Sequence, residues 1–213
     1  QKPNLAHNQI VHLARPLRIR KILTTNFDSL MEQAFAQVRL PIRVLETTVD
    51  GFLPDPALTV GSNCLIKLHG GDQQTRADFS LNEAPSELDR ERFVQYLQHR
   101  RNVGKREDGC YNPSHLLLLG FSGSDWRIID LIQEALWRIP HLKVFCVANS
   151  KRSEATFREQ FDGWRENVRV FTLGRADLVL LRLYQELTLA LPPGGFSSRF
   201  GQPVPAGEHA GED

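Results

Sequence analysis

Several short segments of this chain are apolar from end to end, and each one leads into an amphipathic helix. The clearest is HLLLLG at 115–120, which passes through a few polar residues into a helix expected at about 125–139. A strand that is apolar on both faces is typical of a parallel sheet covered by helices on both sides. The sequence therefore predicts an α/β fold with a parallel sheet between two layers of helices.

The same alternation of strands and helices continues along the chain. Further strands are expected at 21–25, 64–69, 142–148 and 168–172, and further helices at 4–15, about 29–39, about 87–101, 153–161 and about 176–190. Ser29 and Glu32 have the spacing of a capping box at the start of the helix at 29–39. A loop that contains Pro41, Gly51, Pro54 and Pro56 is expected to lead into the strand at 64–69.

The pattern divides the chain into one domain, an insert and a tail. We expect a single domain over 1–191, because the length suits one core. Charged and polar residues dominate 72–114, which we expect to form an inserted, mostly helical lid. Residues 192–213 are rich in Gly and Pro without periodicity and predict a disordered tail. The chain starts at Gln1 and has no initiator methionine, so we expect it to be a fragment or a processed product.

Composition and charge disfavour several classes of function. The net charge is +1 and 24% of residues are charged, so no overall charge favours nucleic acid, and no apolar run is long enough to span a bilayer. Cys64, Cys110 and Cys146 lie far apart and form no CxxC pair. This argues against a structural zinc site and a disulfide framework and favours a reducing compartment. We therefore expect a cytoplasmic protein with no metal and no membrane partner.

Polar residues follow four of the expected strands. In chain order these residues are Thr25, Asn26 and Asp28, then His69, then Gly120, Ser122 and Asp125, and finally Asn149 and Ser150. The carboxyl ends of parallel strands meet at one edge of a sheet, where open α/β folds bind their ligands. The same residue types also suit helix N-caps and turns, so a purely structural role stays open for each of them.

Five segments together resemble a known family. TTNFD at 24–28, LHG at 68–70, LGFSGSDWRI at 119–128, ANS at 148–150 and LGRADLVLLRL at 173–183 resemble, in this order, the sirtuin fold. The likeness is closer to its sirtuin-like bacterial branch and covers roughly residues 4–190. The resemblance implies a Rossmann-like domain that binds NAD and cleaves the bond between nicotinamide and ribose.

The resemblance assigns three catalytic residues. Asn26 would orient the ribose or the attacking water, and Asp28 would hold the nicotinamide amide. His69 would act as a general base on a ribose hydroxyl or on water, since an imidazole titrates near neutral pH. Each of these residues would also contact NAD.

Further residues are assigned to NAD binding by the same resemblance. Gly120 and Ser122 match residues that contact the adenine-ribose side, and Asn149 matches a residue that contacts ribose. Thr25, Ser150 and Ala176 complete the expected NAD site.

Two departures from the family narrow the expected activity. Deacylating sirtuins carry two CxxC pairs after the histidine, whereas this chain has the charged insert 72–114 there. The family's first strand and its GAGxS loop would precede residue 4. We therefore expect an NAD⁺ hydrolase, an effector domain of bacterial antiphage defence, which acts with a sensor domain, a partner protein or a second copy. A non-catalytic module that senses NAD or ADP-ribose is the alternative, and an NAD-dependent protein deacylase is less favoured.

Overall fold

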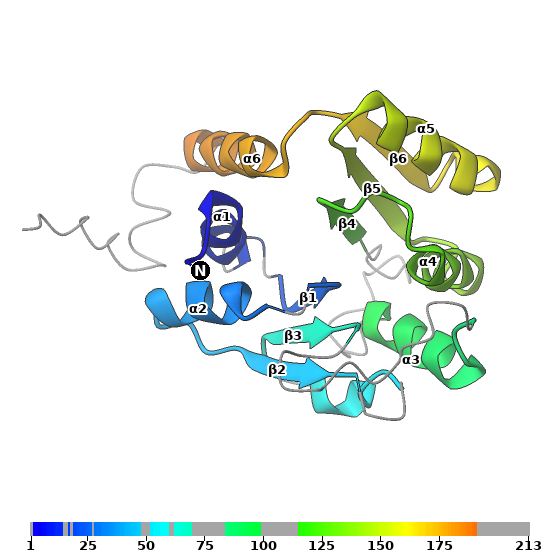
Figure 1. Cartoon of the computed structure of the whole chain (residues 1–213), viewed down its shortest axis with the longest axis horizontal. Coiled ribbons are helices and arrows are strands. Elements are labelled where there is room, and N and C mark those ends of the chain that lie inside the picture. Colours follow the sequence, from blue (N-terminus) through cyan, green and yellow to red (C-terminus); the bar gives the residue numbers. More distant parts are fainter. Residues whose placement is uncertain are drawn as a thin grey trace, which may run out of the picture.

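The computed structural model describes residues 2–14, 17, 19–26, 28–47, 52–59, 62–69, 84–98 and 115–190. The predicted tail at 192–213, Gly70 and the parts of the predicted lid outside 84–98 lie outside this range. The elements in chain order are α1 (Leu5–Ala14), β1 (Lys21–Thr24), α2 (Leu30–Gln37), β2 (Arg43–Glu46), the 3₁₀ turn η1 (Pro56–Thr59), β3 (Cys64–Lys67), α3 (Glu87–Leu97), β4 (His115–Leu119), α4 (Trp126–Arg138), β5 (Lys143–Ala148), α5 (Lys151–Gln160), the 3₁₀ turn η2 (Asp162–Trp164), β6 (Val168–Thr172) and α6 (Ala176–Ala190) (Figure 1).

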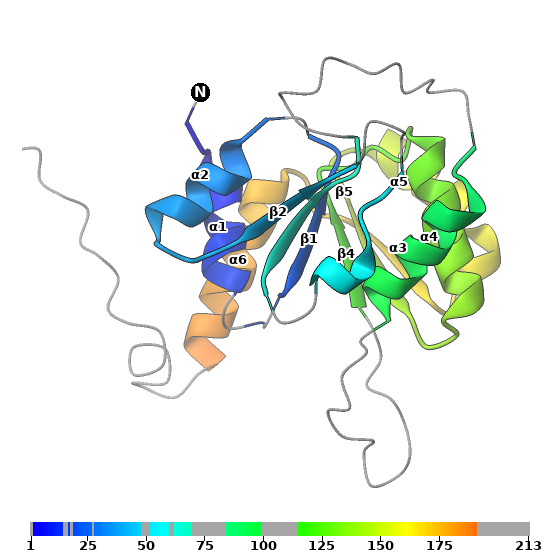
Figure 2. The ribbon, with the colours of Figure 1, turned by 90° about the horizontal axis from the view of Figure 1, so that it is seen from below.

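The strands of the described residues form two parallel sheets of three strands each. Their orders are β1-β3-β2 and β4-β5-β6, so the first sheet places the non-consecutive strands β1 and β3 side by side, whereas the second sheet follows the chain order. Helices α1, α2 and α6 lie on one side of the strands and α3, α4 and α5 on the other (Figure 2). The arrangement is Rossmann-like and confirms the predicted α/β class with helices on both faces.

Two apolar clusters hold the layers together. The larger one joins β3 of the first sheet to β5 of the second, through Cys64, Ile66, Val144 and Cys146, and to the buried face of α4. The smaller one packs α1 and α2 against Leu65. Successive side chains of a strand point to opposite faces, so β3 contributes to both clusters and is buried throughout.

The structure differs from the sequence prediction at two strands. Residues Arg43–Glu46 form strand β2 within the segment that was expected to be a loop. This strand lies at the edge of its sheet and buries only Leu45 and part of Glu46, so its sequence lacks a clear apolar pattern. Conversely, β4 was expected to be buried on both faces, yet Leu117 is 43% exposed. Among the described residues β4 pairs only with β5, which leaves it at a sheet edge.

The predicted capping box at the start of α2 is wrong. Ser29 is the N-cap residue but its side chain makes no cap hydrogen bond. The carboxylate of Asp28 instead accepts a hydrogen bond from the N–H of Leu30 (3.1 Å). Glu32 forms an ion pair with Lys67 on β3, because the longer side chain meets a buried cation across the helix–strand interface.

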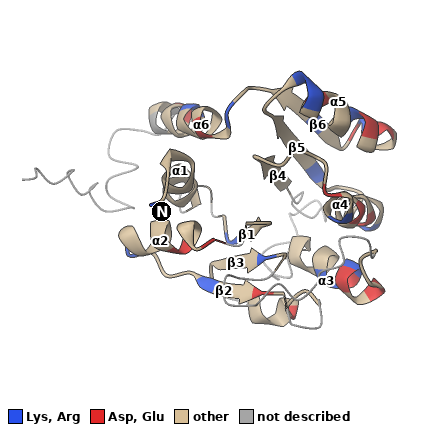
Figure 3. Cartoon of the chain, in the orientation of Figure 1, with Lys and Arg blue, Asp and Glu red and all other residues tan. Residues whose placement is uncertain are grey.

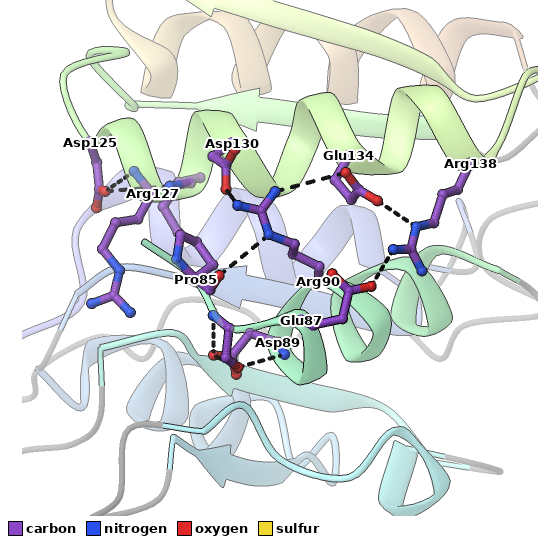
Figure 4. A network of polar contacts seen from close by, with 11 residues as sticks. Pro85, Glu87, Asp89, Arg90, Asp125, Arg127, Asp130, Glu134 and Arg138 are labelled. Atoms are coloured by element: carbon purple, nitrogen blue, oxygen red, sulfur yellow. Dashed lines mark hydrogen bonds and ion pairs between the residues drawn. The ribbon is translucent and has the colours of Figure 1, made fainter. Parts of the chain in front are cut away.

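Helix α3 is the described part of the predicted insert, and it packs against α4 through charged side chains. Figure 3 shows that acidic and basic residues gather where these two helices meet. Arg90 of α3 pairs with Asp130 at 2.7 Å, and Arg138 of α4 pairs with Glu134 and with Glu87 (Figure 4). These contacts attach the described part of the insert to the helix that follows β4. No described helix combines the length and apolar character needed to cross a membrane.

Candidate active site

The carboxyl ends of β1 and β3 lie next to each other. Thr24 pairs with Lys67 in the parallel ladder, and the N–H of Leu68 donates a hydrogen bond to the Thr24 carbonyl (2.9 Å). Asn26 lies two residues after Thr24, and His69 lies two residues after Lys67. Two of the three predicted catalytic residues therefore come from neighbouring strand ends at one edge of the sheet.

One side-chain contact joins this edge to the second half of the chain. The Nε2 atom of His69 lies 2.8 Å from Oδ2 of Asp125, 56 residues later in the sequence. Asp125 is the N-cap residue of α4, and its Oδ1 accepts from the N–H groups of Arg127 and Ile128. The pKa of the Asp125 carboxyl is lowered, chiefly by the hydrogen bond with His69. The structure thus forms a histidine–carboxylate pair between the two sheets.

Asn26 and Asp28 make local hydrogen bonds. The backbone N–H of Asn26 donates to the hydroxyl of Thr24 (3.1 Å), and Asn26 is exposed. Asp28 is half-buried and accepts from the N–H of Leu30 at the start of α2. Thr25, between Thr24 and Asn26, is also half-buried. The amide and the carboxylate therefore stand at the same strand end, with Asp28 held by the first turn of α2.

The loop between β4 and α4 depends on two glycines with positive φ. Gly120 has φ +67°, and no heavy atom lies within 4 Å of the position that a Cβ would take. Gly123 has φ +78°, and there a Cβ would lie 3.1 Å from the Thr156 side chain. The exposed hydroxyl of Ser122 lies 2.6 Å from that of Ser124. Gly120 thus leaves bare, approachable backbone, whereas Gly123 allows the loop to pack on α5.

The remaining predicted NAD contacts lie at the starts of α5 and α6. Ser150 caps α5 by accepting from the N–H of Ser153, and the Ser153 hydroxyl donates to Oδ1 of Asn149 (2.8 Å). Ala176 is the half-buried first residue of α6. The hydrogen bonds of Asn149 and Ser150 stay within the first turn of α5, so they do not connect these residues to His69.

A small pocket lies beside His69. It is lined by Leu53, Leu68, His69, Pro85, Asp89, Arg127, Ile128 and Leu131. Asp89 is buried, and its two oxygens accept from the N–H of Leu53 and from the hydroxyl of Ser86. The insert helix α3 and the loop before it therefore form one wall of the pocket. Within the part of the chain that is described, no three His, Cys, Asp or Glu residues gather as a metal site would require.

A buried ion pair lies close to the strand end that carries His69, and it was not predicted from the sequence. Nζ of Lys67 lies 2.7 Å from Oε1 of Glu32, and the lysine side chain is only 3% exposed. Glu46 of β2 lies further from it, at 3.8 Å. A lysine inside the apolar run CLIKL was the available sequence signal, because a charge in such a position needs a partner. Nothing local identifies Glu32 as that partner.

Comparison with known proteins identifies one family. The family model described as SIR2-like domain matches residues 20–168, which is more than half of the chain. The match runs from just before β1 to the first residue of β6 and includes both members of the His69–Asp125 pair. No curated protein matches the chain significantly.

Proposed function

The chain belongs to the SIR2-like domain family, whose domains use NAD, and from this premise we propose that it is an NAD⁺ hydrolase. The observation that carries the proposal is the placement of His69. This imidazole follows the end of β3, next to the strand end that carries Asn26, and it is paired with the carboxylate of Asp125. A histidine held in this way at a ligand-binding sheet edge is suited to general base catalysis.

The donor set fits a nicotinamide riboside. A carboxylate such as that of Asp28 accepts hydrogen bonds from a carboxamide, and the Asn26 amide can both donate to and accept from a ribose hydroxyl or a water. The open space beside the Gly120 backbone, after β4, suits close approach of a ligand. The proposal therefore keeps the predicted roles of Asn26, Asp28 and His69 and the predicted NAD contacts of Thr25, Gly120, Ser122, Asn149, Ser150 and Ala176.

In the proposed reaction, water replaces nicotinamide at the anomeric carbon of the ribose. The glycosidic C–N bond breaks and its electron pair goes to the ring nitrogen, which loses its positive charge. Asn26 orients the ribose or the water, and His69 takes the proton that the water loses as its oxygen bonds to the carbon. Positive charge develops on the ribose as in glycoside hydrolysis, so groups that hold the sugar and the water contribute most.

The decisive experiment measures nicotinamide release from NAD by the full gene product, without any acyl-peptide. We expect steady release, and a loss of about 100-fold or more in kcat for His69→Ala and for Asn26→Ala. His141→Ala is the matched control, because this exposed histidine follows α4 and lies outside the site. An enzyme that releases nicotinamide only with an acylated peptide would instead be a deacylase. Calorimetric binding of ADP-ribose without any release would support the sensing alternative.

An effector role in antiphage defence is part of the proposal and needs its own test. We expect infected cells that express the wild-type gene with its neighbouring genes to lose NAD, and cells with His69→Ala to keep it. The NAD content of infected and uninfected cultures measures this directly. Wild-type cells whose NAD stays constant through infection would contradict the defence role, even if the purified protein hydrolyses NAD.

A further inference from the structure

We propose that Asp125 is a positioning residue for His69, which holds the imidazole as the Nε2–H tautomer and so makes Nδ1 the basic nitrogen. The proposal rests on the hydrolase function above, since it specifies which atom of His69 accepts the proton. It gives Asp125 a role beyond its place as the N-cap of α4.

The geometry of the pair carries the assignment. Nε2 of His69 and Oδ2 of Asp125 are 2.8 Å apart, and their side chains are only 13% and 22% exposed. A contact this short between partly buried groups is a charge-assisted hydrogen bond rather than a solvent-separated pair. The two residues follow strands of different sheets, so the contact also fixes where the end of β3 lies relative to α4.

The other oxygen of Asp125 fixes the orientation of the carboxylate. Oδ1 accepts from the backbone N–H groups of Arg127 at 3.2 Å and Ile128 at 3.4 Å, which belong to the first turn of α4 (Figure 4). The positive end of the helix dipole favours the ionised carboxylate at this position. One oxygen is therefore tied to the helix while the other is presented to His69.

An ionised carboxylate can only accept a hydrogen bond, so the nitrogen that faces it must carry the proton. In a neutral imidazole the lone pair then resides on the other nitrogen, Nδ1. When Nδ1 takes a proton from water or a ribose hydroxyl, the ring becomes positive and remains paired with Asp125. Asp89 and Arg127 are the other charged groups lining the same pocket, and Asp89 is already bonded to Leu53 and Ser86. Among the described residues, Asp125 is the carboxylate that lies within hydrogen-bond distance of the ring.

Asp125→Asn separates positioning from capping. Asparagine is as good an N-cap as aspartate, so α4 should keep its start. With the amide oxygen on the helix, the amide NH₂ faces Nε2 and donates to it, which moves the ring proton to Nδ1. Nδ1 then already carries a proton and cannot accept another, so His69 no longer acts as a base although the fold is kept. The same loss occurs in serine–histidine–aspartate triads. We expect kcat to fall about 100-fold or more with KM little changed.

Two further variants complete the kinetic experiment. Asp125→Ser also keeps a cap but makes no contact with the ring, and we expect it to lose kcat as well. Asp130→Asn makes the same chemical change on the same helix, where the carboxylate pairs with Arg90 instead. It should leave kcat unchanged. Melting curves verify that each variant is folded at the assay temperature, and full activity in Asp125→Asn would overturn the proposal.

A spectroscopic readout tests the pair independently of turnover. Ring ¹⁵N shifts of His69, recorded at about pH 8 where an imidazole is ordinarily neutral, distinguish the two tautomers. We expect Nε2–H in the wild type and in Asp130→Asn, and Nδ1–H in Asp125→Asn. An Nδ1–H ring in the wild type would overturn the proposal. If the tautomer is as expected but no nicotinamide is released, the hydrolase function fails while the assignment of the pair stands.

Discussion

Lys67 shows how a single residue can tie the candidate site to the core. Its charge is buried in a strand whose other residues are apolar, and Glu32 of α2 neutralises it. Glu32 lies one turn beyond Asp28, and Lys67 lies two residues before His69. The ion pair therefore links the two chain segments that carry these proposed catalytic residues. Asp125 makes the corresponding link on the side of α4.

Removing the lysine should destabilise the protein strongly. Lys67→Met leaves Glu32 without its cation in a partly buried place, and we expect the free energy of unfolding to fall by about 3 kcal/mol. The double variant Lys67→Met/Glu32→Gln removes both charges and should recover part of that loss. Urea unfolding of the three proteins measures this. A double variant that is less stable than Lys67→Met would contradict the pairing.

The His69–Asp125 pair should make stability depend on pH in the acid range. The pKa of Asp125 is lower in the folded protein than its ordinary value of 3.8, chiefly through the hydrogen bond with His69. A carboxyl with a lowered pKa stabilises the fold above its unfolded pKa, and this contribution is lost as pH falls through the folded pKa. We expect the stability difference between wild type and Asp125→Asn to shrink as pH falls below 3.8. Urea titrations at several acid pH values measure it, and a constant difference would contradict the pairing.

At the scale of elements, the loop between β4 and α4 positions Asp125. It turns through two glycines with positive φ, and Gly123 allows close contact with α5. The sequence identified a turn here from GFSGSD. The separate requirements of the two glycines follow only from the packing of Thr156 and Phe157 against the loop.

Alanine substitutions should distinguish the two glycines. In Gly120→Ala the only cost is the backbone strain of positive φ. We expect this variant to lower the free energy of unfolding by about 1 kcal/mol. Gly123→Ala adds a contact at 3.1 Å with Thr156 and should cost about 2 kcal/mol or more. Melting temperatures rank the two variants, and equal effects would contradict this account of the loop. Gly120→Ala should also weaken NAD binding if ligand approaches the backbone there.

At the scale of the whole molecule, the two sheets formed by the described strands share the larger apolar cluster. The larger cluster contains Ile66 of the first sheet, Val144 of the second and Ile132 of α4. Side-chain packing rather than a continuous backbone ladder therefore joins the two halves. Ion pairing between α3 and α4 also holds the two halves together.

The shared core predicts cooperative unfolding. Trp126, Trp137 and Trp164 all lie in the half that contains the second sheet, so fluorescence reports mainly on that half. Far-UV circular dichroism reports on both halves. We expect the two signals to change at the same urea concentration, because neither sheet keeps a complete core alone. Midpoints that differ between the two probes would show that the sheets unfold separately.

The sequence alone determined the succession of elements. Apolar runs and helical periodicity located β1, β3, β4, β5, β6 and the six helices of the described residues to within a few residues, because these patterns follow from which side chains must be buried. It did not predict β2, whose short edge position requires almost no apolar pattern. It also identified the polar residues that follow β1, β3, β4 and β5, because they stand directly after apolar runs.

The tertiary structure decided which of those residues meet. His69 could have paired with any of several polar neighbours, and its contact with Asp125 depends on how α4 packs relative to β3. Ser29 and Glu32 had the spacing of a capping box, yet Glu32 instead forms an ion pair with the buried Lys67 across the helix–strand interface. Local sequence encodes propensity and burial, whereas contacts between residues far apart in the chain arise only once the layers are packed.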